Sequence, residues 1–304
     1  MDHFSIRKWT DIHLTNTISV ESENSSTFSF LLTDISTQET TEITIPASLR
    51  ATLSTISDDD GFTPLNTNNS TYNNTDDKYN LFNFPLISPN KLFDEDTRVK
   101  VNTSISPYKS IGYLKTKYEN SDSYYRGTAY LVGSHIAITA AHCAYSRSDG
   151  GATSMTFSPA RDGDSYPYGT ANVTKYAVLS EYKNGDDWAI LILDSNIGDV
   201  AGTITFGKYN TATDCLGIGS VISGYPVDKG YSQYGANGYI NSVSDYKVWY
   251  TIDTEGGQSG SPIMDANRRA YGVHTGGSKE DGTNWGCRVN DRFYDLVQYA
   301  FDNY

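Results

Sequence analysis

The chain has 304 residues, enough for two domains or for one large domain with an extension. Its formal net charge of −13 argues against nucleic acid as a partner, because binding to phosphates needs an excess of Lys and Arg. No apolar run reaches the roughly 18 residues of a membrane span, so we expect none. The first residues, MDHFSIRKWTDIHLTNT, also lack the apolar stretch of a secretory signal.

The first 90 residues differ in character from the rest. Residues 17–56 carry short alternating patterns, TFSFLLTDI and TTEITI, which predict one or two strands. Residues 57–80 are dense in Asn, Asp, Ser and Thr, and hold too few apolar side chains to offset the cost of ordering the backbone. We therefore predict a propeptide-like extension over residues 1–90, with a low-complexity linker at 57–80.

From residue 91 onward, short β-type runs recur between Gly, Asp and Asn. Their spacing of roughly 10 to 20 residues is typical of an antiparallel barrel or sandwich. The last segment places Phe293, Leu296, Val297 and Ala300 at helical spacing, so we expect one C-terminal helix. Residues 91–304 are thus predicted to form an all-β unit closed by a helix.

The chain contains three cysteines, Cys143, Cys215 and Cys287. An odd number leaves at least one thiol free, and a disulfide between Cys215 and Cys287 stays open. No pair of them has the spacing of metal ligands, so we expect no zinc site.

The segment GGQSGSP, from Gly256 to Pro262, suits a catalytic nucleophile. Attack on a peptide carbonyl needs a nucleophile on a sharply turned backbone, with amide hydrogens pointing to where the oxyanion forms. We expect Ser259 to be the nucleophile, and the amides of Gly257 and Ser259 to form the oxyanion hole. The alternative is an ordinary Gly/Ser-rich surface loop.

Two further segments carry a candidate base and its orienting carboxylate. AITAAHC ends a β-type run on His142, although a lone histidine is more often structural. GDDWAILIL places Asp186 and Asp187 just before an apolar strand, where a buried carboxylate can accept the imidazole N–H. We choose Asp187, which directly precedes Trp188. The order His, Asp, Ser is that of chymotrypsin-like enzymes, and the three motifs together predict catalysis.

AITAAHC, DWAIL and GQSGSP resemble the triad motifs of the trypsin superfamily, and within it the bacterial glutamyl endopeptidases and epidermolytic toxins. DEDTRVKVNTSISPYKSIGYL resembles the start of the mature bacillus-type enzymes, and GVHTGGS with GCRVNDRFYDLV resembles their last strand and helix. The resemblance spans residues 90–304. It implies two six-stranded antiparallel Greek-key barrels with a C-terminal helix, a monomer that needs no cofactor or metal, and secretion.

The resemblance also implies a specificity pocket for acidic residues. His274 and Thr254 stand at the spacings from the nucleophile at which the glutamyl enzymes contact the substrate carboxylate. Both side chains can donate hydrogen bonds to a carboxylate. Asp253 stands where trypsin has the aspartate that selects Lys or Arg, so a preference for basic residues is the alternative.

We therefore predict a serine endopeptidase that acts on proteins or peptides and is restrained by residues 1–90 until they are removed. The rival from another class is a non-catalytic binding module on the same fold. The sequence departs from the family in two places. Cys143 lacks its usual partner cysteine, and PNKLFDED stands where relatives have their mature amino terminus.

Overall fold

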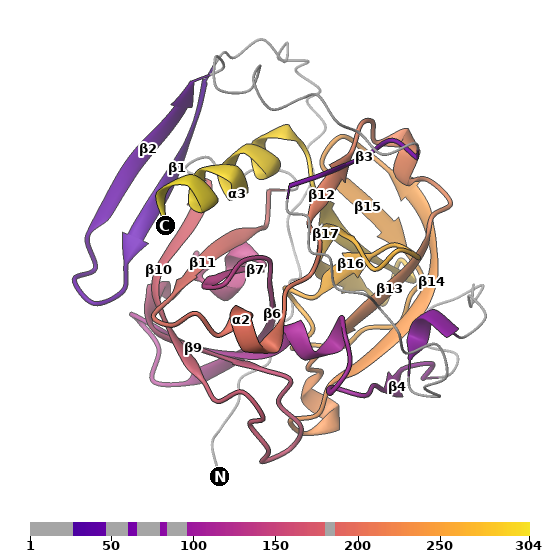
Figure 1. Ribbon diagram of the computed structural model, residues 1–304, viewed down its shortest axis with the longest axis horizontal. Helices are drawn as coiled ribbons and strands as arrows, with labels where there is room; N and C mark the ends of the chain where they lie inside the picture. The colour runs from indigo at the N-terminus through magenta and orange to yellow at the C-terminus, as the bar shows by residue number, and fades with distance from the viewer. Residues whose placement is uncertain (1–26, 47–59, 66–79, 84–95, 180–185) are drawn as a thin grey trace.

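The computed structural model describes residues 27–46, 60–65, 80–83, 96–179 and 186–304 (Figure 1). Six strands form the first barrel: β5 (Ile111–Tyr118), β6 (Tyr124–Leu131), β7 (Ile136–Thr139), β9 (Gly150–Pro159), β10 (Ala171–Leu179) and β11 (Ala189–Leu193). Their hydrogen-bonded order is β10-β11-β7-β6-β5-β9, and a pairing of β10 with β9 closes the barrel.

The second barrel repeats this architecture with six further strands: β13 (Gly219–Gly224), β14 (Tyr234–Val243), β15 (Lys247–Tyr250), β16 (Pro262–Met264), β17 (Ala270–Ser278) and β18 (Thr283–Arg288). Their order is β13-β16-β17-β18-β15-β14, closed by pairing of β13 with β14. The prediction of two six-stranded antiparallel barrels is therefore confirmed.

Short elements connect and extend the barrels. They are β4 (Val99–Lys100), β8 (Tyr145–Ser146), α2 (Gly198–Ala201) and β12 (Gly207–Tyr209), with 3-10 turns at Tyr108–Ser110, Ala141–Cys143, Thr213–Cys215 and Val227–Lys229. The chain ends in α3 (Asp291–Asn303), which confirms the predicted C-terminal helix. Asn290 caps it, because its side chain accepts a hydrogen bond from the backbone N–H of Phe293 at 3.0 Å.

Three pieces of the N-terminal extension pack on the barrels. β1 (Thr27–Asp34) and β2 (Thr40–Pro46) form a hairpin beside β10 (Figure 1), so the strands expected within residues 17–56 are confirmed. β3 (Phe62–Pro64) pairs with β12, although it lies within the stretch predicted as a linker. Its Phe62 is fully buried and packs edge-on against Tyr209. This one apolar side chain explains why β3 packs on the second barrel although the surrounding sequence is polar. A 3-10 turn at Leu81–Asn83 contacts β14.

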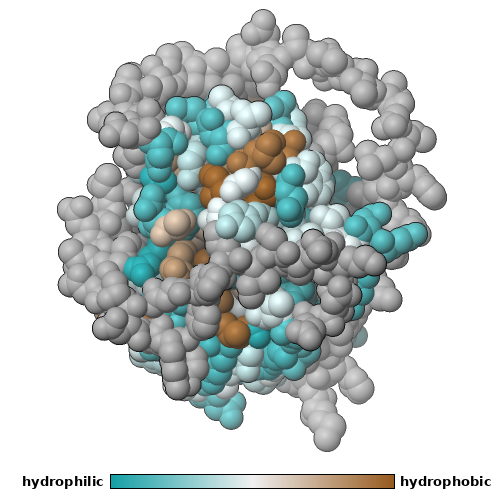
Figure 2. Space-filling model, turned by 90° about the vertical axis from the view of Figure 1, so that its right-hand side faces the viewer, coloured by the Kyte–Doolittle hydropathy of each residue, from teal (hydrophilic) through white to brown (hydrophobic). Residues whose placement is uncertain are grey.

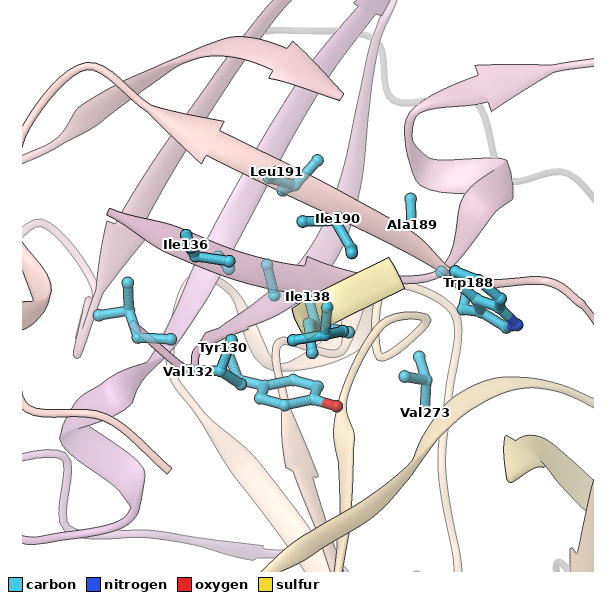
Figure 3. Close-up of a cluster of buried hydrophobic side chains, with 14 of the residues drawn as sticks. Tyr130, Val132, Ile136, Ile138, Trp188, Ala189, Ile190, Leu191 and Val273 are labelled. Atoms are coloured by element: carbon cyan, nitrogen blue, oxygen red, sulfur yellow. The ribbon is translucent and has the colours of Figure 1, made fainter. Parts of the chain in front are cut away.

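The main core runs from the first barrel to α3. Trp188, directly before β11, belongs to one buried cluster with Ile138 of the first barrel and Val273 of the second (Figure 3), so side chains of both barrels meet in this core. Its ring stacks on that of Phe293 in α3, with centroids 4.1 Å apart and planes 4° apart. Such offset stacking adds to the free energy gained by burying two large rings.

The face of the second barrel is mainly hydrophilic, with a few apolar areas near its centre (Figure 2). Among the described residues, no helix has the length and apolar character that crossing a membrane requires.

Replacing Phe293 by alanine should destabilise the fold by about 3–5 kcal/mol, because it removes the stacking partner of Trp188 and leaves a cavity. The thermal unfolding midpoint of the variant should fall clearly below that of the wild type. Val200→Ala, at an exposed position of α2, is the matched control and should leave the midpoint almost unchanged. Equal midpoints for the two variants would contradict a central role of this stack.

Candidate active site

The imidazole of His142 is bound to Asp187. Nδ1 of His142 lies 2.7 Å from Oδ2 of Asp187, and Oδ1 of the same carboxylate accepts the backbone N–H of His142 at 2.9 Å. The 3-10 turn that follows β7 carries the histidine, and the aspartate directly precedes Trp188 and β11. Two bonds to one carboxylate fix both the position and the orientation of the ring.

Electrostatics at this pair favour a charged imidazole. Burial of the ring disfavours its protonation, but the Asp187 carboxylate and the neighbouring Cys143 together outweigh that effect and hold the pKa of His142 well above its usual value. The hydrogen bond to the carboxylate acts in the same direction. The pair can thus accept and hold a proton at Nε2.

The neighbouring Asp186 has a different partner. Its Oδ2 lies 3.1 Å from a guanidinium nitrogen of Arg292 in α3, while burial raises the pKa of its carboxyl to about 6. The two adjacent carboxylates therefore point to different parts of the fold: Asp187 to His142, and Asp186 to the C-terminal helix.

Ser259 lies on the loop between β15 and β16, and its backbone contacts the residue that follows His142. Its carbonyl oxygen accepts the backbone N–H of Thr128 at 2.8 Å and lies 3.7 Å from Sγ of Cys143, the residue after the histidine. Gly260 follows with a φ of 90°, and a Cβ there would lie 1.9 Å from the carbonyl oxygen of Thr128. Only glycine can make this close approach of the loop to β6.

The amides of Gly257 and Ser259 are available as donors. The carbonyl of Gly256 accepts the N–H of Val227 at 2.8 Å, so the N–H of Gly257 points to the opposite side of the planar peptide. Gly257 itself has a φ of 92°, in the region that favours glycine. In the part of the chain that the structure describes, neither amide donates a hydrogen bond to another group. Two unused donors on one tight turn are what an oxyanion requires.

Gln258, to which the sequence assigned no role, supports this turn. Its side chain is fully buried, and its Oε1 accepts the N–H of Glu255 at 2.9 Å. Its Nε2 donates to the carbonyl of Tyr234 at 3.4 Å. A polar residue with a long side chain, directly between Gly257 and the predicted nucleophile, is the sequence signal that could have identified it.

The predicted pocket residues come from the middle of β17, which carries His274, and from the segment after β15, which carries Asp253 and Thr254. His274 is buried, and its Nδ1 is 2.7 Å from the hydroxyl of Tyr250. Burial lowers the pKa of His274 to about 3, with the nearby His142 adding to the effect. The ring is therefore neutral at physiological pH.

The side chain of Thr254 accepts a hydrogen bond from Asn284. The Asn284 amide nitrogen donates to the carbonyl of Ile252 at 2.8 Å and to Oγ1 of Thr254 at 2.9 Å. Because Oγ1 accepts this bond, the hydroxyl hydrogen of Thr254 is directed elsewhere. Asn284 and Tyr250 are paired residues of neighbouring strands, so one cross-strand pair contacts both candidate donors.

Asp253 is hydrogen-bonded to the segment that precedes β4. Its Oδ2 accepts the backbone N–H of Thr97 at 2.8 Å and the Thr97 hydroxyl at 2.7 Å. Only 5% of its surface is exposed. This carboxylate serves as an anchor for residue 97, a contact that no motif in the sequence indicated.

Comparisons with known proteins identify the family of this chain. The family described as Trypsin matches residues 100–297. A glutamyl endopeptidase of Bacillus licheniformis is 34% identical over 66% of this chain and 66% of its own length. A protein of Bacillus subtilis named extracellular metalloprotease is 33% identical over 71% of this chain and 72% of its own length. Among the described residues, no group of three or more His, Cys, Asp or Glu side chains is placed to hold a metal ion.

Solved structures show the same fold. A Glu endopeptidase bound to MPD superposes with a TM-score of 0.62 and 30% identity, covering 69% of this chain and 99% of its own. The protease Anisep of Arthrobacter nicotinovorans, at 20% identity and a TM-score of 0.55, shares the fold over 64% of this chain. The rest of this chain has no counterpart in either structure.

Substitution of Asp187 by asparagine should lower the pKa of His142, because the negative charge that stabilises the imidazolium is removed. A proton NMR titration of the imidazole should show a wild-type pKa above the ordinary value of about 6.5, and a clearly lower one in the variant. Asp186→Asn is the matched control and should leave this titration nearly unchanged. A larger effect of Asp186→Asn would contradict the assignment of Asp187.

Proposed function

Because this chain belongs to the trypsin family of serine endopeptidases, we propose that it hydrolyses peptide bonds after acidic residues, with glutamate preferred. We assign the nucleophile to Ser259, the base to His142 and the orienting carboxylate to Asp187. The observation that carries the catalytic assignment is the two-bond contact between His142 and Asp187 beside a turn with two unused amides. Protein and peptide chains are its substrates.

The chemistry follows from these positions. As Ser259 Oγ attacks the peptide carbonyl, Nε2 of His142 takes the hydroxyl proton, and the amides of Gly257 and Ser259 stabilise the oxyanion. The imidazolium then gives this proton to the leaving amine, so that the C–N bond breaks and an acyl-enzyme remains. Water, deprotonated by the same imidazole, attacks the ester and releases the new carboxyl end of the substrate. A pKa of His142 above the usual value means that kcat/KM should fall as the pH drops through it.

The hydrogen bonds around His274 support a preference for acidic residues before the cleaved bond. The Tyr250 hydroxyl is fully buried, and burial raises its pKa well above the usual value, so it keeps its proton. Among the described residues, this hydroxyl has Nδ1 of His274 as its acceptor, an arrangement that assigns the proton of the neutral ring to Nε2. The backbone of Trp285 also hydrogen-bonds to the ring, so a substrate carboxylate would compete with it for the ring N–H. The hydroxyl of Thr254 is the second donor, and hydrogen bonds to a charged group are strong in a pocket shielded from water.

The alternative of cleavage after Lys or Arg depends on Asp253. Its side chain is 5% exposed, and Oδ2 already accepts two hydrogen bonds from Thr97. A substrate cation would have to compete with these bonds, whereas a substrate carboxylate meets groups that have hydrogens to donate. The contacts favour the acidic preference.

We also propose that the protein is secreted, as the name of the Bacillus subtilis relative says of that protein. Restraint of the enzyme by residues 1–90 stays a prediction, as does a monomeric state. A non-catalytic binding module remains the rival from another class.

Hydrolysis of matched peptides ending in Glu, Asp, Lys or Phe tests the proposal directly. We expect the highest kcat/KM after Glu, and a loss of about 10⁴- to 10⁶-fold in kcat when Ser259 is replaced by alanine. Cleavage after Lys, abolished by the same substitution, would keep the triad and assign the pocket to Asp253. If the folded protein cleaves none of the peptides, before and after a cut following residue 90, the binding module is favoured.

The replacement Tyr250→Phe should reduce selectivity for glutamate without harming the triad. Losing the bond that fixes the His274 tautomer should lower kcat/KM for a Glu peptide about tenfold, mainly through KM. The matched Gln peptide, which carries no charge, should change little. Tyr239→Phe, at an exposed position of β14, is the control. An equal loss for both peptides would indicate general damage instead of a specificity role.

A further inference from the structure

β10 has an edge that the barrel leaves open. One edge pairs with β11 from Val173 to Val178, but on the other edge β9 reaches only Ala171 and Asn172. β1 pairs along the remainder of that edge, from Leu179 to Lys175. An open strand edge carries unpaired N–H and C=O groups and invites association with other chains. The N-terminal hairpin thus completes the hydrogen bonding of a barrel strand.

The hairpin is also bound by side chains. Phe30 is fully buried, and its ring lies edge-on to Tyr299 of α3 with centroids 5.2 Å apart. Phe28 and Ile45 are 8% and 2% exposed and belong to the main core. Asp34 forms an ion pair with Lys175. The hairpin is therefore packed into the main hydrophobic core as the barrel strands are.

A second attachment lies at β3. The N–H of Leu65 donates to the carbonyl of Phe206 at 2.8 Å, and the carbonyl of Pro64 accepts the hydroxyl of Tyr294 in α3 at 3.1 Å. Asp60 forms an ion pair of 2.5 Å with Arg269, which also binds Asp265. Here the extension contacts both the second barrel and the C-terminal helix.

A third attachment is Leu81, which is 3% exposed. Its N–H donates to the hydroxyl of Tyr108 at 2.8 Å, and its carbonyl accepts the amide of Asn237 at 3.1 Å. The three attachments lie on the first barrel, the second barrel and the helix, so one stretch of 27–83 contacts every layer of the protease.

Two of these attachments act on the helix that supports the catalytic aspartate. α3 contacts Phe30 through Tyr299 and Pro64 through Tyr294. In the same helix, Phe293 stacks on Trp188, and Arg292 pairs with Asp186. The residues on either side of Asp187 are therefore held by a helix that the N-terminal segment itself contacts.

We propose that residues 27–83 stay bound to the barrels after any cut between residues 83 and 96, as a strand-donating segment that holds α3 against residues 186–188. The partner that fits the β10 edge and the outer face of α3 is thus the chain's own N-terminal segment. This role is additional to peptide hydrolysis. It also means that cleavage of the chain and release of the extension are separate events, so a cut could relieve a restraint on the enzyme while the extension stays bound.

The test is a single engineered cut in the full chain. A recognition sequence for a site-specific protease, flanked by Gly-Ser repeats, is inserted between residues 88 and 89 in the Ser259→Ala background, so that the protein cannot cut itself. After complete cleavage, native size-exclusion chromatography with mass spectrometry should find both fragments in one peak. Separate peaks for the two fragments without denaturant would overturn the proposal. Both outcomes are independent of which peptides the enzyme cleaves.

Variants then test how the segment is held and what it supports. Phe30→Ala should make the cut fragments separate at a lower urea concentration than in the wild type, while Thr41→Asp, at an exposed position of the same hairpin, should not. In the active background, the cut Phe30→Ala protein should lose kcat at urea concentrations where the cut wild type keeps it, with KM little changed. Release of the fragment with no loss of kcat would refute the supporting role towards Asp187.

Discussion

The stack between Trp188 and Phe293 is the contact on which the catalytic geometry depends. Both neighbours of Asp187 in the chain contact α3: Asp186 pairs with Arg292, and Trp188 stacks on Phe293. The Asp187 carboxylate therefore cannot move away from His142 without disturbing this helix. A carboxylate that must stay charged near a buried ring needs such support, because water cannot solvate it freely. The C-terminal helix thus supports the proposed triad through the two residues that flank Asp187.

Thr128 connects the two barrels at the nucleophile. This buried residue of β6 donates its N–H to the carbonyl of Ser259 and its hydroxyl to the carbonyl of Gly257 at 2.9 Å. The hydroxyl oxygen in turn accepts the N–H of Tyr225. The first barrel therefore supplies His142 and Asp187 and also fixes the turn of the second barrel on which Ser259 lies.

The sequence predicted the parts of the fold that repeat a local pattern. Strands such as WAILIL and the spacing of Phe293, Leu296 and Val297 predicted β11 and α3, and the motif order indicated the triad. The sequence did not predict contacts between segments that are distant along the chain. Neither the bond of Asp253 to Thr97 nor the cross-strand pair of Tyr250 and Asn284 follows from spacing along the chain, because barrel closure alone brings them together. β3 was missed because a single buried Phe62 gives no periodicity.

All three cysteines are buried thiols, including Cys143 beside the catalytic histidine. Burial raises the pKa of Cys215 to about 12 and that of Cys287 well above its usual value, so these two sulfurs are not reactive thiolates. The two barrels are consequently held by packing and hydrogen bonds without a covalent cross-link. Reducing agents that disable disulfide-stapled proteases therefore have no bond to break between these cysteines.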